Sequence, residues 1–216
     1  MIHVEACVES AEAAVAAVQG GAHRIELCAN LAVGGTSPGT ALLEECLSRV
    51  TIPVFVMIRP RAGHFHYSAV EQEEMLQEIQ RAKAVGAGGI VTGALRPDRT
   101  VAERFTREMI AVARPLPVTF HRAFDECPDA DQALETVIAL GATRVLTSGR
   151  AATAPDGAAT IAKLVQLAAE RIAIVAGGGI AADNVAELVR ASGVHEVHLS
   201  TKDADKIRRV IEALTR

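Results

Sequence analysis

Short runs of β-branched residues alternate along the whole chain with longer stretches rich in Ala, Leu and Glu. The short runs have the length and composition of strands, and the longer stretches have those of helices. The predicted strands are Ile2–Cys7, Arg24–Cys28, Pro53–Arg59, Gly89–Gly93, Leu116–His121, Thr143–Ser148, Ile172–Gly177 and Glu196–Ser200. The predicted helices are Ala11–Gln19, Pro38–Val50, Ala69–Val85, Val101–Ala113, Ala130–Leu140, Ala158–Ala169, Ala182–Arg190 and Ala204–Leu214.

Strands and helices that alternate eight times, at roughly 27 residues per unit, predict an α/β fold of the (β/α)8 TIM-barrel type. We expect residues 1–216 to form a single domain, because no linker or low-complexity segment interrupts the pattern. A doubly wound open sheet is the alternative fold. The even spacing of the eight repeats favours the barrel over it.

Three of the predicted strands are polar at every second position. Polar residues alternate with Val, Ala, Ile or Leu in Ile2–Cys7, Arg24–Cys28 and Glu196–Ser200, so that His198 shares a face with Glu196 and Ser200. The apolar set must face the outer helices, so the polar set points into the barrel and outlines a pocket at its C-terminal mouth. The residues that begin strands, Arg24, Arg144 and Glu196, are expected at the opposite end in a structural role.

The first two strands end in the same pattern, Glu5-Ala6-Cys7 and Glu26-Leu27-Cys28. Strands joined by one helix normally lie side by side, so two carboxylates and two thiols are predicted to converge at one end of the sheet. Thiolates suit Cu(I), and a histidine nitrogen, with His121 the candidate, can complete such a site. A stagger of the barrel by one layer would instead separate the sulfurs. Instead of a metal ligand, each cysteine could simply be a small buried hydrophobic residue. We interpret Cys46 in this way. Cys127 is a possible third thiol ligand.

A second group of candidates follows the third and fifth strands. Arg59 is expected to point into the mouth, where its planar guanidinium could bind a carboxylate or phosphate or pair with Glu5 or Glu26. His121 beside these carboxylates could act as a general acid or base, or be a simple hydrogen-bonding group. With Asp125 at the strand tip, the candidate catalytic residues are Glu5, Glu26, Arg59, His121 and Asp125.

Three consecutive glycines, Gly177, Gly178 and Gly179, lie between the seventh strand and the next predicted helix. Glycines there let backbone N–H groups approach an anion, and the loops after strands seven and eight are the usual phosphate site of this fold. The candidate anion-binding residues are Arg59, Ser148, Gly177, Gly178, Gly179 and Ser200. A simple tight turn is the alternative.

Composition limits the partners of this protein. Half of the 216 residues are hydrophobic, which is ample for one core, and the formal charge is only −4 with no basic run, so nucleic acid is not an expected partner. No apolar stretch approaches the roughly 20 residues that span a bilayer, and no signal peptide precedes the first strand, so we expect no membrane segment. The four cysteines form no CxxC pair, which favours a reduced, cytoplasmic protein.

Several segments together resemble the CutC family. They are Arg24-Ile25-Glu26-Leu27-Cys28, Gly34-Gly35-Thr36-Ser37-Pro38, Ile58-Arg59-Pro60-Arg61-Ala62-Gly63, Val91-Thr92-Gly93, Thr119-Phe120-His121-Arg122-Ala123-Phe124-Asp125 and Arg144-Val145-Leu146-Thr147-Ser148-Gly149. The resemblance implies a TIM barrel with a part in copper tolerance, Cu(I) bound through Cys7 and Cys28, a cytoplasmic location and a homo-oligomer. This sequence departs from the family after strand eight, where Ser200 passes almost directly to Asp203, so we expect a more open mouth on that side.

Two functions follow from these observations. The first is copper homeostasis, in which Cys7 and Cys28 hold Cu(I) at the barrel mouth. The second is an enzyme that acts by general acid–base chemistry on a small anionic metabolite carrying a phosphate or carboxylate. Two sulfurs within bridging distance would favour the metal.

Overall fold

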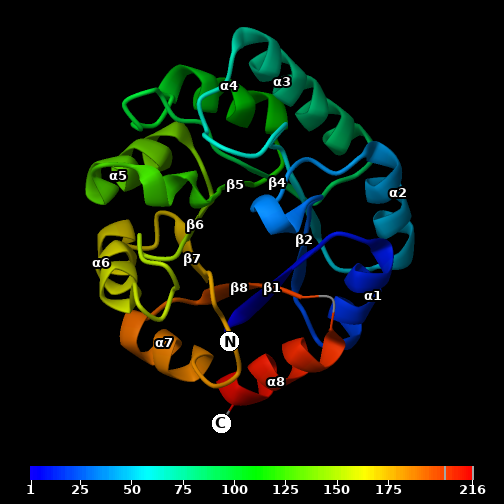
Figure 1. Cartoon of the computed structure of the whole chain (residues 1–216), viewed down its shortest axis with the longest axis vertical. Coiled ribbons are helices and arrows are strands. Elements are labelled where there is room, and N and C mark those ends of the chain that lie inside the picture. The colour runs from blue at the N-terminus through cyan, green and yellow to red at the C-terminus, as the bar shows by residue number, and fades with distance from the viewer. Residues whose placement is uncertain (202, 216) are drawn as a thin grey trace.

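A computed structural model describes residues 1–201 and 203–215 of the chain. Eight parallel strands pair in sequence order and close into a barrel (Figure 1), which confirms the predicted fold class. The strands are β1 (His3–Val8), β2 (Arg24–Leu27), β3 (Val54–Met57), β4 (Gly89–Thr92), β5 (Val118–Phe120), β6 (Arg144–Thr147), β7 (Ala173–Gly177) and β8 (Glu196–Ser200). The main core lies between the barrel and its outer helices, where the apolar residues of the alternating strands are buried.

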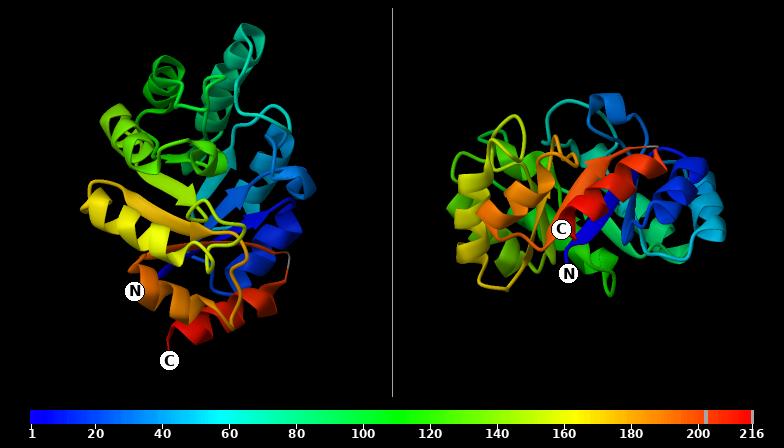
Figure 2. Two further views of the ribbon diagram at one scale, coloured as in Figure 1. Left: turned by 60° about the vertical axis from the view of Figure 1, so that its left-hand side comes forward. Right: turned by 90° about the horizontal axis from the view of Figure 1, so that it is seen from below.

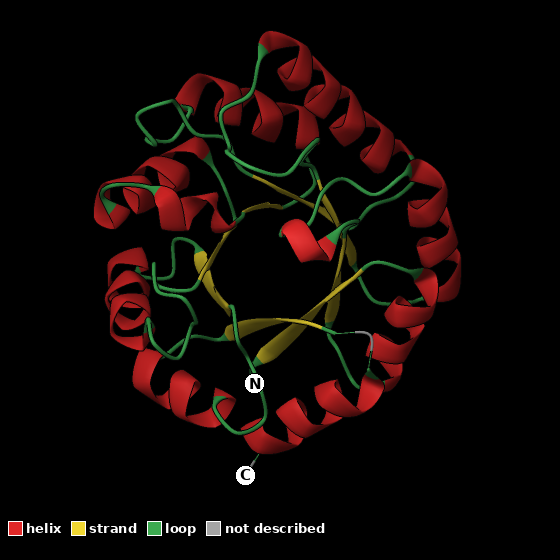
Figure 3. Cartoon of the chain, viewed as in Figure 1, coloured by secondary structure: helices red, strands yellow, loops and turns green. Residues whose placement is uncertain are grey.

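The helices form a ring around the barrel (Figure 2). They are α1 (Ala11–Gln19), α2 (Thr40–Arg49), α3 (Ala69–Ala84), α4 (Glu103–Ala113), α5 (Ala130–Leu140), α6 (Ala158–Ala168), α7 (Val185–Ser192) and α8 (Ala204–Leu214). Two short 3-10 helices, η1 (Leu31–Val33) and η2 (Arg122–Glu126), follow β2 and β5. In Figure 3, η1 lies over the opening of the barrel. Among the described residues, no helix combines the length and the apolar character needed to cross a membrane.

Three helices begin later than predicted. α2 begins at Thr40 rather than Pro38, α4 at Glu103 rather than Val101, and α7 at Val185 rather than Ala182. The backbone of Val101 is instead bridged to that of Leu95. Ahead of α7, the Asn184 side chain accepts a hydrogen bond from the Ala181 N–H (3.0 Å) and so closes a turn. The glycine loop after β7 is therefore separated from the helix N-terminus by this turn.

The register of β1 and β2 differs from the alignment that the repeated Glu-X-Cys pattern suggests. Glu5 lies opposite Arg24, and Cys7 lies opposite Glu26, so the two strands are offset by two residues relative to that alignment. Closing a sheet into a barrel requires such a stagger between neighbouring strands. As a consequence, Glu5 shares a layer with Arg24, while Glu26 shares the next layer with Cys7.

Charged side chains fill the barrel below the cysteines. The Arg24 guanidinium pairs with Glu5 and with Glu196 (2.6 Å), and Glu196 also pairs with Arg144 (3.2 Å). Both guanidinium groups lie over the ring of Phe55, at 4.9 and 5.2 Å from its centroid. Opposite charges in contact offset the cost of burying each of them. The structural role predicted for Arg24, Arg144 and Glu196 agrees with this arrangement.

Candidate functional site

The thiols of Cys7 and Cys28 lie together at the floor of the barrel mouth. Their sulfur atoms are 3.3 Å apart, and both residues are free cysteines with at most 1% of their surface exposed. The Cys7 thiol donates to Glu26 Oε1 (3.2 Å), and the Cys28 thiol donates to the Val8 carbonyl (3.6 Å). The stagger pairs Cys7 with Glu26 and so places Cys28 two residues further along the chain, but the two sulfurs are still in contact.

His198 of β8 completes this cluster. Its Nδ1 lies 2.8 Å from Glu5 Oε1 and 3.8 Å from Glu26 Oε2. Cys7, Glu26 and His198 each offer one potential metal-ligand atom, and these three atoms lie within 4.8 Å of one another. Glu26 Oε2 is buried and has no hydrogen-bond partner among the described residues. The sequence places His198 on the inward face of its strand, but only the β1–β8 register shows that it lies opposite Glu5.

The protonation states of this cluster follow from burial and from the neighbouring charges. Burial raises the pKa of Glu5, but the hydrogen bond from His198 and the charges of Arg24 and His198 outweigh it and lower this pKa to about 2. For His198, burial lowers the pKa, and the two nearby glutamates more than compensate and raise it. Burial raises the pKa of Glu26. The contact with Cys28, burial and the Glu26 charge together raise the pKa of Cys7 well above its usual range.

Arg59 is buried (5% exposed) and binds neither glutamate. Its guanidinium donates hydrogen bonds to the carbonyls of Val33 (3.1 Å), Gly35 (2.8 Å) and Gly63 (3.0 Å). It also lies over the ring of Phe65, 4.8 Å from the centroid. Arg59 thus ties together the loops that follow β2 and β3. Of the two alternatives for Arg59, the ion pair with Glu5 or Glu26 is absent among the described residues.

His121 lies on the β3–β5 side of the mouth, just after β5. Its Nδ1 accepts a hydrogen bond from the Ala123 N–H (3.2 Å), and its ring packs against Phe65 with 4.9 Å between centroids. A Cβ on Gly93 would lie 2.6 Å from this ring, so only glycine leaves the space that the imidazole occupies. Burial and the Arg59 charge lower the pKa of His121 to about 3. A neutral imidazole across the physiological range does not match the acid–base role predicted for it. His121 is also not the histidine of the potential metal site. Among the described residues, the group of three potential metal ligands contains His198 instead.

Asp125 and Ser148 stabilise the loop after β6. The Asp125 carboxylate accepts hydrogen bonds from the Ser148 N–H (3.1 Å), the Ser148 hydroxyl (3.1 Å), the Arg122 Nε (2.8 Å) and the Thr147 hydroxyl. The Ser148 hydroxyl also lies 2.7 Å from Arg122 Nη2. Asp125 of η2 therefore holds the start of the loop after β6, and the hydrogen bonds of both predicted site residues join these two segments.

A cavity of about 360 Å³ opens at the barrel mouth, where Cys7 of the thiol pair lines it. Its lining includes Cys7, Glu26 and His198 of the cluster, Arg59 and His121, and Gly178, Gly179 and Ser200 from the ends of β7 and β8. Gly178 and Gly179 adopt φ angles of +108° and +74°, which favour glycine. Gly177 belongs to β7 and packs against Leu146 and His198. Lys206 of α8 also borders the cavity, and no sequence pattern identified it. The segment between Ser200 and Asp203, where a more open mouth was expected, contains a residue outside the described part of the chain.

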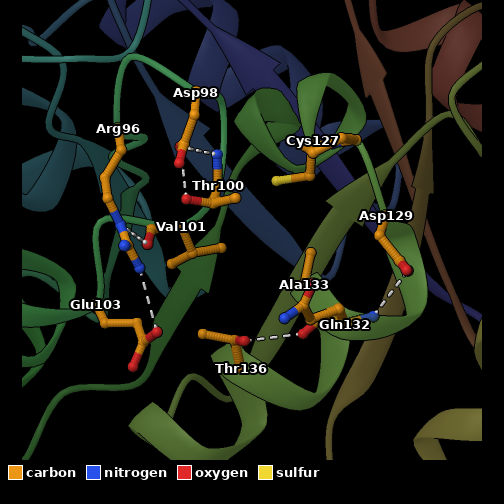
Figure 4. A pocket seen from close by; sticks show the side chains of 11 residues that line it. Arg96, Asp98, Thr100, Val101, Glu103, Cys127, Asp129, Gln132, Ala133 and Thr136 are labelled. Carbon is orange, nitrogen blue, oxygen red and sulfur yellow. Dashed lines mark hydrogen bonds and ion pairs between the residues drawn. The ribbon is translucent and has the colours of Figure 1, made fainter.

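A smaller cavity of about 190 Å³ lies outside the barrel, against α5 and the loops after β4 and β5 (Figure 4). Its polar groups already bind one another: Arg96 pairs with Glu103 (3.3 Å), and Asp98 accepts from the Thr100 hydroxyl (2.6 Å). Cys127 borders this cavity and not the one above the thiol pair, so the structure does not bring it to Cys7 and Cys28.

The fold and the site together define a (β/α)8-barrel protein whose C-terminal mouth holds a buried thiol–carboxylate–imidazole cluster beneath an open cavity. A sequence model of the CutC family matches residues 2–203. The chain belongs to the CutC family.

Named relatives support this assignment. The human copper homeostasis protein cutC homolog is 47% identical over 199 residues, which cover 92% of this chain and 73% of the human one. A family protein CutC of Vibrio campbellii is 46% identical, over 92% of this chain and 81% of the relative. The solved structure of a CutC protein from Streptococcus agalactiae has a TM-score of 0.88 at 34% identity and covers 93% of this chain and 99% of its own. A phosphoribosylanthranilate isomerase from Thermotoga maritima, at 14% identity and a TM-score of 0.65, shares the fold alone.

Proposed function

We propose that this protein acts in copper homeostasis by binding Cu(I), as its cargo, through Cys7 and Cys28. The observation that carries the proposal is the 3.3 Å separation of two buried, unoxidised sulfurs. Two sulfurs on one ion can lie up to about 4.6 Å apart, twice a metal–sulfur bond of about 2.3 Å, so both can reach the same ion. Thiolate is the ligand type that selects Cu(I). The names of the human and mouse relatives support the same function.

Two neighbours of the thiols bear on how copper would bind. Glu26 and His198 lie close enough to Cys7 to share an ion with it, and the cavity above gives a path of entry. A thiol must lose its proton to bind a metal, and the pKa of Cys7 is raised by its contact with Cys28 and by burial. Copper binding is therefore expected to weaken as the pH falls.

We also propose a cytoplasmic location and a homo-oligomeric state, which the family resemblance implies. Cys7 and Cys28 can bind copper only as reduced thiols, and the cytoplasm is the compartment that keeps thiols reduced. Light scattering on the purified protein measures the oligomeric state directly, and a monomer at micromolar concentration would contradict that part of the proposal.

A titration of the reduced protein with Cu(I) against a competing chelator tests the copper proposal. We expect tight, stoichiometric binding that is lost in the Cys7→Ser, Cys28→Ser double variant. Cys127→Ser is the matched control, because this buried thiol borders the outer cavity instead, and it should bind copper like the wild type. Equal, weak binding in the wild type and the double variant would refute the proposal.

A second candidate function is an enzyme that acts on a small anionic metabolite. The observation that favours it is the cavity of about 360 Å³, which far exceeds the space of one ion and is bordered by Arg122 and Lys206. In such an enzyme, Glu26 and His198 would move protons, in place of the His121 predicted from sequence. NMR spectra of phosphorylated and carboxylated metabolites incubated with the protein would test it. Turnover should stop in Glu26→Gln and continue in Lys163→Met, which alters a surface lysine of α6.

A further inference from the structure

The side of the mouth formed by the ends of β3 and β5 holds polar atoms that have no partner. Arg59 Nε, His121 Nε2 and the Tyr67 hydroxyl are all buried, and none has a hydrogen-bond partner among the described residues. The three residues are 5%, 3% and 9% exposed. Buried polar groups in folded proteins are nearly always paired, so three unpaired groups in one region need a specific explanation.

Two of these atoms are hydrogen-bond donors and cannot be acceptors. Arg59 Nε carries a proton at every physiological pH. His121 Nδ1 accepts from the Ala123 N–H, so the single proton of the neutral ring is on Nε2. Phe65 lies against both groups, 4.8 Å from the Arg59 guanidinium and 4.9 Å from the His121 ring. For Arg59 and His121, which border the cavity, the missing partner is therefore an acceptor.

The charge on this side is also uncompensated. All three hydrogen bonds of the Arg59 guanidinium go to backbone carbonyls, and no carboxylate among the described residues lies within ion-pair distance. Arg24 and Arg144, which are also largely buried, both pair with Glu196. A buried guanidinium without a carboxylate is costly, and a negatively charged ligand would remove that cost.

The cavity that Arg59 and His121 border fits such a ligand. Its volume of about 360 Å³ is that of a small-molecule site. Two further cationic side chains border the cavity. Arg122 pairs with Asp125 through Nε (2.8 Å), and its Nη1 lies beside Gly178. Lys206 contacts the Ser200 carbonyl through Nζ (3.2 Å). Much of the remaining wall is apolar, from Leu31, Met57, Phe65, Leu146, Ile180 and Leu199. Charge complementarity requires an anionic group, and the apolar wall suits an organic body.

We propose that the barrel mouth binds a small organic anion, a carboxylate or a phosphate monoester with an apolar body, whose charged group accepts hydrogen bonds from Arg59 Nε and His121 Nε2. Lys206, which has no carboxylate within ion-pair distance among the described residues, raises the local concentration of such anions at the entrance. This inference deepens the second candidate function by naming its substrate class, but the binding itself requires neither turnover nor Cys7 and Cys28.

Calorimetric titration of the metal-free protein with four probes tests the proposal. Phenyl phosphate and benzoate carry both an anionic group and an apolar body, inorganic phosphate lacks the body, and benzyl alcohol lacks the charge. We expect saturable one-to-one binding of phenyl phosphate or benzoate, with binding of the other two at least about tenfold weaker. The stronger of the two organic anions identifies the group that the site recognises.

His121→Asn links the binding to the proposed contact. Asparagine can still accept the Ala123 N–H bond but lacks the Nε2 donor. We expect at least about tenfold weaker binding of the organic anion, while Lys163→Met, which changes a lysine outside the cavity, leaves it unchanged. In the wild type, the NMR signal of the His121 Nε2–H should move on saturation, a readout that needs no variant.

The absence of saturable binding for both organic anions would overturn the proposal. So would binding that leaves the His121 Nε2–H signal unmoved and is equally strong in His121→Asn. Because no turnover is measured, a protein that binds the probes and converts no metabolite supports this inference and contradicts only the enzymatic function. The Cu(I) titration is independent of both.

Discussion

Replacing Glu5 by Gln tests whether the buried ion layer stabilises the barrel. Glu5 is 1% exposed and accepts hydrogen bonds from Arg24 and His198. Burial alone would raise its pKa, but these two partners lower it from 4.5 to about 2. At 1.36 kcal/mol per pKa unit, this difference is worth roughly 3 kcal/mol of folding free energy, which is similar to the cost of breaking other buried pairs.

The pH dependence of this contribution has a definite sign. The folded-state pKa lies below that of the unfolded chain, so the stabilisation is fully present above about pH 4.5 and is lost as the pH falls towards 2. Urea unfolding followed by circular dichroism should show Glu5→Gln about 3 kcal/mol less stable than the wild type at pH 7. The difference should shrink towards zero near pH 2.

A surface carboxylate provides the control for this experiment. Glu12 of α1 pairs with Arg49 at an exposed site, and Glu12→Gln should unfold like the wild type at both pH values. Equal stability of Glu5→Gln and the wild type at pH 7 would refute the reasoning. If Glu5→Gln were less stable than the wild type by the same amount at pH 2 as at pH 7, the shape of the Glu5 side chain, and not its charge, would account for its contribution to stability.

Two further predictions concern single positions around the mouth. Gly157→Ala should destabilise the fold by about 3 kcal/mol in the same urea assay, because an added Cβ would lie 1.9 Å from the Ser148 carbonyl oxygen; unchanged stability would mean that the loop after β6 moves freely. The His121 ring should show no titration between pH 5 and 8 by NMR, because burial and the Arg59 charge lower its pKa to about 3; a midpoint near 6.5 would contradict its burial.

The fold could be predicted from sequence because it depends on a pattern that repeats eight times. Alternation of polar and apolar residues in β1, β2 and β8 identified the inward face of each strand and hence the polar mouth. Helix starts were less predictable. Val101 is an acceptable helix residue, and only its backbone bridge to Leu95 delays α4 to Glu103. Such a backbone bridge leaves no signal in the residue types of the helix itself.

The site was partly predictable for a related reason. The Glu-X-Cys repeat identified the two strands that carry the thiols, but the amount of stagger between those strands is a property of barrel closure. That stagger puts Glu5 beside Arg24, and it makes Cys7 the neighbour of Glu26. The hydrogen-bond partners of Arg59 could not be predicted from sequence either. They are backbone carbonyls of two loops, and the residue types of those loops do not determine where the carbonyls lie.

The two halves of the mouth suggest why one cavity serves two candidate ligands. β1, β2 and β8 supply thiol, carboxylate and imidazole groups, whereas Arg59 and His121, which follow β3 and β5, each supply an unpaired N–H donor. The lower ion layer compensates charge in the first half, since Arg24 pairs with Glu5 and the two nearby glutamates raise the pKa of His198. Because both halves border the same 360 Å³, a bound anion at Arg59 and an ion at Cys7 would be close enough to interact, and any effect of one on the affinity of the other must be reciprocal.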